Sequence, residues 1–340
     1  MSYSYLAYGL NLKSKAEIQG LMPVPPDSDV SVNDDVEIFI GATPAWVEAA
    51  LRLPAELVYA SGSGGETDVT FRFSALGNQQ FFQFSYLDGT RFVVEAETRR
   101  IWGTCPLPLT QEDLAIYLLG PLMGFVLRRR GILALHASCF CGSGRSFALC
   151  GVQGAGKSTT AAALALKGIP ILCEDIAALR QRDGSFWTAP GYPRVNLWPD
   201  SAASLFETPE TLPTITPNWE KRFLPLDGAM AQFEHREQRL AAVYILEARS
   251  DSDDAPRIEE VPAREAALLL VQNTYMNYLL NKEQRAMEFD AIAQLVSGTV
   301  VRRLVPHSDP AKIAATCELL QVDSANIAEK MDRAGAGQPK

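Results

Sequence analysis

The sequence lacks several patterns that would set it apart from ordinary globular proteins. None of its six cysteines belongs to paired C-x-x-C motifs or to a cysteine and histidine set with the spacing of a metal site. The longest apolar stretch, residues 114–127, is too short to span a bilayer and contains glycine and proline. The N-terminal residues have neither the basic region nor the apolar core of a secretory signal. We therefore expect a cytoplasmic protein with reduced thiols and no membrane partner.

The sequence also lacks an excess of basic residues. Its 31 lysines and arginines stand against 40 acidic residues, which gives a net charge of −9 and an isoelectric point near 5.0. Binding to a phosphate backbone needs a basic surface, so the composition argues against a nucleic-acid partner. With 340 residues, 47% of them hydrophobic, the chain is long enough for one large or two ordinary domains.

One short stretch carries most of the functional information. Residues 151–158 read Gly-Val-Gln-Gly-Ala-Gly-Lys-Ser, after one apolar run and before an alanine-rich one. That order predicts a strand, a phosphate-binding loop (P-loop) and a helix, with backbone N–H groups turned toward one centre. Lys157 would reach the β- and γ-phosphates and Ser158 would ligate Mg²⁺. The motif thus predicts ATP and Mg²⁺ as ligands. The predicted nucleotide-binding residues are Gly151, Val152, Gln153, Gly154, Ala155, Gly156, Lys157, Ser158 and Thr159.

Residues 1–105 predict a separate small α+β domain. Alternating apolar residues indicate strands, Asp88-Gly89 is a typical hairpin turn, and no residue type there points to a particular chemistry. We expect the aromatic residues of the hairpin to belong to the core. The domain is a candidate for acceptor recognition. The expected elements are a strand over 36–40, a helix starting at 43–46, a flexible loop over 61–65 and a hairpin of 80–86 with 90–95.

Residues 106–330 predict the nucleotide-binding domain. Its distinguishing feature is that the strand entering the P-loop follows directly from another strand, so that the two form an antiparallel hairpin. The last ten residues, 331–340, are expected to be a disordered tail. The further expected elements are a buried helix over 114–127, strands 132–140, 145–150, 169–173, 241–246 and 300–305, a second hairpin over 176–188, and helices 158–167, 262–281, 283–295 and 309–320.

These features together resemble the HPr kinase/phosphorylase family, which has a carboxykinase-like P-loop fold with a mixed sheet. The resemblance covers roughly residues 110–230 and rests on His136, the hairpin into the P-loop, and the acidic pair Glu174-Asp175. It is closer still to the HPr-kinase-related proteins found with lasso-peptide biosynthesis, through Arg130-Gly131 and Leu135-His-Ala-Ser138. The resemblance implies a kinase for a serine of a peptide or protein, such as a lasso-peptide precursor. Since HPr kinases form ring oligomers, it also implies self-association.

The resemblance also implies roles for individual residues. Glu174 falls where the family has the carboxylate that takes the proton of the substrate hydroxyl, and Asp175 falls at a magnesium-linked aspartate. The family usually has Asp-Asp here, so the base would lie one methylene further out. His136 would orient the base or a phosphate oxygen, and Arg194 would hold the transferring phosphoryl group.

Each of these roles has a structural alternative. One carboxylate of the pair could simply cap a loop, and His136 could be a core histidine. Neighbouring residues of an extended strand point to opposite faces, so both carboxylates face one site only if the strand ends there. Lys221 and Arg222 are further candidate cations, for which solvation at the surface is an equal alternative.

Three functions remain open from the sequence. The first is a kinase for a serine-containing peptide or protein, and the second is a kinase for a small hydroxyl metabolite. The third is a nucleotide-binding switch or assembly protein with little phosphotransfer. The sequence has no transporter-type ATPase signature, and Asn281-Lys-Glu-Gln284 lacks the aspartate of a guanine-reading motif. Both absences reduce the support for the third function without excluding it.

Overall fold

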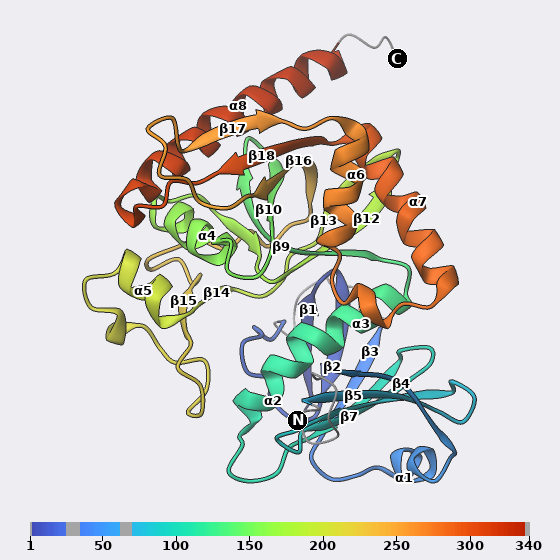
Figure 1. Ribbon diagram of the computed structural model, residues 1–340. Coiled ribbons are helices and arrows are strands. Elements are labelled where there is room, and N and C mark those ends of the chain that lie inside the picture. Colours follow the sequence, from blue (N-terminus) through green and yellow to red (C-terminus); the bar gives the residue numbers. More distant parts are fainter. Residues whose placement is uncertain (1, 25–34, 62–69, 337–340) are drawn as a thin grey trace. The chain divides into compact units, whose positions relative to one another are not determined.

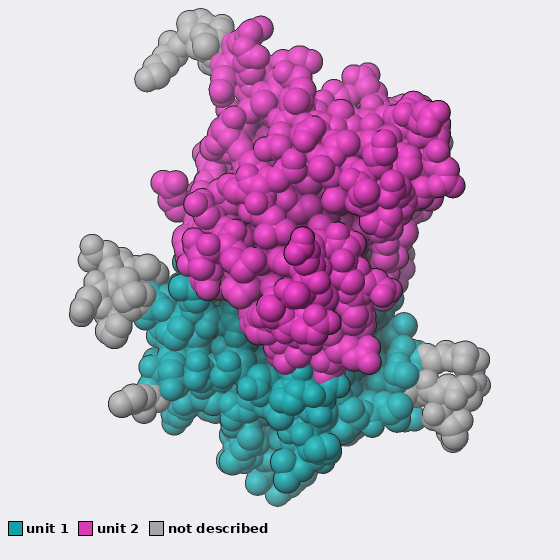
Figure 2. Space-filling model, turned by 90° about the vertical axis from the view of Figure 1, so that its left-hand side faces the viewer, with its two compact units in different colours: residues 1–131, 216–218, 276–281 teal, residues 132–215, 219–275, 282–340 magenta. Residues whose placement is uncertain are grey.

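The computed structural model describes residues 2–24, 35–61 and 70–336, which form two compact units (Figure 2). Unit 1 comprises residues 1–131, 216–218 and 276–281, and unit 2 comprises the rest. Most of the predicted loop over 61–65 lies outside the described residues. Over the three described ranges, no helix combines the length and the apolar character needed to cross a membrane.

Unit 1 is built on one eight-stranded sheet, ordered β1-β2-β3-β8-β7-β6-β5-β4. The strand predicted over 36–40 and the hairpin around Asp88-Gly89 are confirmed, because β6 and β7 pair antiparallel. The elements are β1 (Tyr3–Ala7), β2 (Leu10–Ser14), β3 (Val36–Ile40), α1 (Ala45–Leu51), β4 (Ala55–Ser61), β5 (Phe71–Leu76), β6 (Phe81–Tyr86), β7 (Arg91–Glu95) and β8 (Arg100–Thr104).

The predicted buried helix belongs to unit 1, which moves the boundary from the expected residue 105 to Gly131. The ring of Phe125 packs edge-on against three phenylalanines of the sheet, with centroids 5.2–5.3 Å apart. This aromatic contact explains why the helix packs with the N-terminal sheet. The helix consists of α2 (Gln111–Tyr117), a π-helical turn, η2 (Leu118–Leu122), that contains Pro121, and α3 (Met123–Arg129).

Unit 2 is a mixed α/β unit that begins with the predicted hairpin. Strands β9 (Leu133–Gly142) and β10 (Arg145–Cys150) pair antiparallel, as expected. Strand β10 also pairs in parallel with β16 (Gln238–Leu246), which pairs in parallel with β18 (Val300–Val305). The other strands are β11 (Ile171–Cys173), β12 (Ile176–Arg182), β13 (Ser185–Thr188) and β17 (Arg257–Glu260), with a separate ribbon of β14 (Arg194–Leu197) and β15 (Arg222–Pro225).

Helices cover both faces of this sheet (Figure 1). Phe147 and Leu149 of β10 belong to the apolar cluster formed with α4 and α8, whereas Ala148 and Cys150 belong to the cluster formed with α6 and α7. A strand buried on both faces is apolar at every position, which explains the run that precedes the P-loop. All six cysteines are free thiols, and five are buried. The helices are α4 (Lys157–Leu166), α5 (Pro199–Leu205), α6 (Ala263–Gln272), α7 (Lys282–Gly298) and α8 (Ile313–Ala336), with 3₁₀ turns η3 (Pro209–Thr211), η4 (Asn277–Leu279) in unit 1 and η5 (Pro310–Lys312).

Helix α8 is longer than the sequence pattern predicts. The expected helix ended at Leu320 and residues 331–340 were expected to be disordered, but the helix continues to Ala336. Ile327 is buried in the cluster with α4, and the hydroxyl of Tyr244 donates to Asp323 at 2.8 Å. These contacts stabilise the later turns, so the prediction for 331–336 is wrong. Residues 337–340 lie outside the described part of the chain.

Candidate active site

The P-loop links the end of β10 to the start of α4. Gly151, Gly154 and Gly156 have φ angles of 149°, 82° and 104°, which favour glycine. A Cβ on Gly151 would lie 2.8 Å from the carbonyl oxygen of Leu246, so the loop starts in close contact with the end of β16. Because no side chain within the described residues caps α4, its first backbone N–H groups remain available to an anion.

Lys157 lies across the loop that it follows. Its side chain is buried, and its ammonium group donates to the carbonyl oxygens of Gly151 at 2.7 Å and Val152 at 3.2 Å. Burial lowers the pKa of Lys157 below its usual range. The charge is thus held beside the backbone of the loop, and the predicted contact of Lys157 with phosphates stays a prediction.

Glu174 and Asp175 follow directly after β11. The strand ends at Cys173, and Asp175 has a φ of 68°, in the left-handed region. This turn satisfies the condition set by the sequence, that both carboxylates can face one site only where the strand ends. Holding a non-glycine residue in this conformation costs conformational free energy, and residues strained in this way are often found at functional sites.

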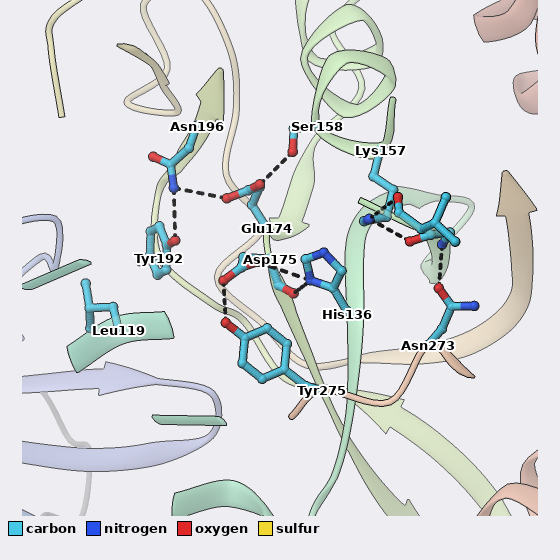
Figure 3. A network of polar contacts seen from close by, with 12 residues as sticks. Leu119, His136, Lys157, Ser158, Glu174, Asp175, Tyr192, Asn196, Asn273 and Tyr275 are labelled. Carbon is cyan, nitrogen blue, oxygen red and sulfur yellow. Dashed lines mark hydrogen bonds and ion pairs between the residues drawn. The ribbon is translucent and has the colours of Figure 1, made fainter. Parts of the chain in front are cut away.

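Glu174 contacts the P-loop serine. Its Oε1 accepts a hydrogen bond from the Ser158 hydroxyl at 2.8 Å, and its Oε2 accepts one from the Asn196 side chain at 3.1 Å (Figure 3). The side chain is only 5% exposed. Burial, together with the neighbouring Asp175 carboxylate, raises the pKa of Glu174 to about 7. The sequence assigned Ser158 and Asp175 to Mg²⁺, whereas the hydrogen bond of the Ser158 hydroxyl is to Glu174.

Asp175 contacts two other side chains. Its Oδ1 lies 3.2 Å from Nδ1 of His136, and its Oδ2 accepts a hydrogen bond from the Tyr275 hydroxyl at 2.9 Å. Burial opposes ionisation of Asp175, but the hydrogen bonds from His136 and Tyr275 outweigh it and lower its pKa. The side chain remains 30% exposed. His136 Nδ1 also lies 3.1 Å from the Asp175 carbonyl oxygen, so the proton of a neutral His136 belongs on Nδ1.

Asn273, which the sequence reasoning missed, fixes the start of the P-loop. The predicted helix over 262–281 ends at Gln272, and the side-chain oxygen of Asn273 accepts the N–H of Gly151 at 2.7 Å. Its side-chain nitrogen donates to Leu269 at 2.8 Å. Tyr275, two residues on, and Asn196 were missed as well. For Asn273 and Tyr275, the available signal was that polar residues follow an amphipathic helix. Nothing in the sequence related these residues to a loop more than a hundred residues away.

The three predicted cations have different surroundings. Arg194 is buried, and its guanidinium carbon lies 5.1 Å from the ring centre of Tyr192 and 5.4 Å from that of Phe223. Within the described ranges, its Nε has no hydrogen-bond partner. Lys221 lies 4.2 Å from the ring of Trp198 and favours ionisation of both carboxylates.

Arg222 has a structural role. Its guanidinium donates to the carbonyl oxygens of Glu210 at 3.1 Å and Leu212 at 2.6 Å, and so holds the loop before β15.

Across the described residues, no group of three or more histidine, cysteine or acidic side chains could hold a metal ion.

Comparisons with known proteins give little support to any assignment. No protein-family model matches the chain, and no curated protein matches it. Among solved structures, the chain is similar to the HPr(Ser) kinase/phosphatase from Coxiella burnetii, with 11% identity over 61% of this chain and 99% of that one, at a TM-score of 0.33. A likeness this weak is no basis for a fold family or an activity. The carboxykinase-like arrangement therefore stays a prediction.

Proposed function

We propose that the chain is an ATP-dependent kinase that transfers the γ-phosphoryl group to a serine hydroxyl of a peptide or protein. The main support is the hydrogen bond between Ser158 and Glu174, which brings a buried carboxylate to the hydroxyl of the P-loop. A phosphate-binding loop alone suits any nucleotide-binding protein. The adjoining pair Glu174 and Asp175 supplies the metal-binding and proton-accepting groups that phosphoryl transfer requires.

The oxygen atoms around Ser158 suit Mg²⁺. This ion takes few protein oxygens and completes its coordination with substrate phosphates and water. Ser158 and Glu174 offer one hydroxyl and one carboxylate, 2.8 Å apart. A cation there would also favour the ionised form of the buried Glu174. We therefore assign Mg²⁺ to Ser158 and Glu174, in place of Ser158 and Asp175. When bound, the ion neutralises charge on the β- and γ-phosphates.

Asp175 is then the residue that takes the proton of the acceptor. Its partial exposure makes it accessible, and His136 and Tyr275 keep it ionised and oriented. The serine oxygen bonds to the γ-phosphorus, and the bond from that phosphorus to the bridging oxygen breaks. ADP leaves with the electron pair of that bond, and the hydroxyl proton passes to Asp175. Lys157 exchanges its carbonyl partners for phosphate oxygens.

Arg194 is the second cation that we assign to the phosphates. Tyr192, on which its guanidinium packs, accepts a hydrogen bond from Asn196, and Asn196 also donates to Glu174. A buried guanidinium whose Nε has no partner within the described residues is suited to an anion. A further cation offsets the charge that spreads over the transferring group.

The acceptor class rests on the resemblance in sequence rather than on the geometry. Asp175 would serve any hydroxyl that reaches it, so a small metabolite remains the second candidate. We propose a peptide or protein serine, with a lasso-peptide precursor as the first one to test, and residues 1–105 as the region that selects it.

The test is ADP formation from MgATP with a serine-ended peptide, with free serine, or with neither. We expect the peptide to stimulate ADP release, and Lys157→Ala to abolish it because the phosphate contact is lost. Stimulation by free serine alone would show that the acceptor is a small metabolite and not a peptide. Equal hydrolysis under all three conditions would favour a nucleotide switch and contradict the kinase.

A further inference from the structure

A cavity of about 200 Å³ lies beside the N-terminal end of α4. All of its lining residues belong to unit 2. They include Gly156 of the P-loop and Thr160 of α4, together with residues distant in sequence. The residues used in the argument below are Gly156, Thr160, Ser204, Arg249 and His307.

The topology of the sheet explains why this cavity adjoins the P-loop. Strands β10, β16 and β18 are neighbours and run in parallel, so the loops at their carboxyl ends meet at one edge. The P-loop follows β10, Arg249 follows β16 and His307 follows β18. The last two loops are tied together, since Ser250 N–H donates to Pro306 at 2.9 Å and its carbonyl accepts Ser308 N–H at 3.0 Å.

Arg249 offers a cation that no described residue uses. Its side chain is exposed and has no hydrogen bond or ion pair within the described residues. Its Nη2 lies 3.5 Å from the point where a Cβ on Gly156 would be, and therefore close to the loop. A planar guanidinium in this position can pack on the face of an aromatic ring.

His307 offers a hydrogen-bond donor. Its Nδ1 accepts the N–H of Asp309 at 2.9 Å, so a neutral ring carries its proton on Nε2. The ring is half-buried and lines the cavity. A donor fixed in this way can recognise an acceptor nitrogen or oxygen on the edge of a base.

We propose that this cavity holds the base and ribose of the nucleoside triphosphate. In this arrangement Arg249 packs against the face of the base and His307 donates from Nε2 to its edge. The inference rests on the proposed function, because it takes the terminal phosphate to lie at Lys157 and Glu174. A triphosphate that starts there and follows the first N–H groups of α4 brings its nucleoside to Thr160 and the cavity.

The experiment compares the binding of ATP with that of inorganic tripolyphosphate, by calorimetry on the full chain. Ser204→Trp fills the cavity from an exposed position on α5, and His307→Asn keeps an acceptor for the Asp309 N–H but removes the far nitrogen. We expect both variants and Arg249→Ala to weaken ATP binding by about 10-fold, the effect of roughly one lost good contact. Tripolyphosphate binding should stay within about 2-fold of the parent.

Two controls separate this inference from the kinase proposal. Arg236→Ala removes an exposed arginine paired with Glu234 and should change neither ligand. Lys157→Ala should weaken both. Variants of the cavity that bind ATP as the parent does, or lose both ligands equally, overturn the nucleoside site and leave the P-loop proposal intact. Undiminished binding of both ligands to Lys157→Ala would instead overturn the proposed function.

Discussion

Glu174 and Asp175 are neighbours in the chain, but their environments shift their pKa values in opposite directions. Glu174 is buried and contacts Ser158, and its pKa is raised to about 7. Asp175 is partly exposed, receives hydrogen bonds from His136 and Tyr275, and has a lowered pKa. Two carboxylates whose environments separate them in this way are suited to different roles. Their contacts favour Glu174 for the metal and Asp175 for the proton.

Substitution of each carboxylate by its amide should separate these roles. Glu174→Gln should weaken ATP binding in the presence of Mg²⁺ by roughly 10- to 100-fold, because a metal ligand is lost. Asp175→Asn should bind MgATP as the parent does and transfer phosphate about 10²- to 10⁴-fold more slowly, because the proton acceptor is lost. Calorimetry with and without Mg²⁺, combined with single-turnover transfer, measures both effects. The reverse pattern would restore the roles expected from the sequence.

The raised pKa of Glu174 also predicts how the stability of the metal-free protein depends on pH. The folded protein binds this proton more tightly than the unfolded chain, whose carboxyl has its ordinary pKa of 4.5. The stabilisation is therefore complete below about pH 4.5 and is lost as the pH rises through about 7. With 1.36 kcal/mol per pKa unit, the loss is about 3 kcal/mol.

Urea unfolding at pH 5 and pH 8, without divalent ions, measures this effect. Glu174→Gln cannot titrate there, so the difference in unfolding free energy between the parent and this variant should change by about 2–3 kcal/mol between the two pH values. The comparison subtracts the contributions of the titrating groups that do not interact with Glu174. A difference that is the same at both pH values would show that the burial of Glu174 carries no such cost.

Site residues that belong to a contiguous sequence motif were predictable, whereas those that reach the site from distant segments were not. Lys157, Ser158 and the glycines follow from one contiguous motif, and they occupy the loop between β10 and α4 as expected. The pairing of Ser158 with Glu174 was not predictable, because it depends on the turn at Asp175. Asn196 carries no local signal, and the position of Asn273 just beyond a helix does not identify its partner, since the contacts of both residues arise only when distant segments pack together.

Among the elements, the turn after α6 supports both halves of the site. Asn273 accepts the N–H of Gly151, and Tyr275 donates to Asp175. The backbone of the same turn pairs with β9, where His136 N–H donates to the Asn273 carbonyl at 2.7 Å. One short segment therefore positions the P-loop and the proposed base together.

Tyr275→Phe should move the acid limb of the pH profile of phosphate transfer to higher pH. The substitution keeps the ring but removes a donor to the ionised carboxylate, so the pKa of Asp175 rises. Tyr244→Phe is a matched control, because it removes a tyrosine hydroxyl bonded to Asp323. We expect it to affect stability but not the profile. Identical profiles for the parent and Tyr275→Phe would contradict the positioning role of Tyr275.

For the molecule as a whole, the two-part organisation was predictable but the boundary was not. Composition and turn signals predicted an N-terminal part and a nucleotide-binding part. The helix that contains Phe125 was assigned to the second part, because nothing in its own sequence shows that phenylalanines of the earlier sheet bury it. The length of α8 was underestimated for the same reason, since its later turns are stabilised by distant contacts such as Tyr244 with Asp323.

Removal of the last turns of α8 should destabilise unit 2. Met331 packs on the apolar cluster of α4 and α8, and Asp332 pairs with Arg145 of β10. A chain that ends at Lys330 should be about 1–2 kcal/mol less stable than one that ends at Ala336, mostly from lost apolar burial. Thermal unfolding of both chains measures the difference. Equal midpoints would support the disordered tail expected from the sequence.

Phosphate transfer itself is the most direct test of the kinase proposal. The measurement is the intact mass of a serine-ended peptide after incubation with the protein and MgATP, with Lys157→Ala as the control. We expect a gain of one phosphate on the peptide with the parent and none with the variant. An unmodified peptide, despite tight binding of MgATP, or equal phosphorylation by both proteins, would contradict the account.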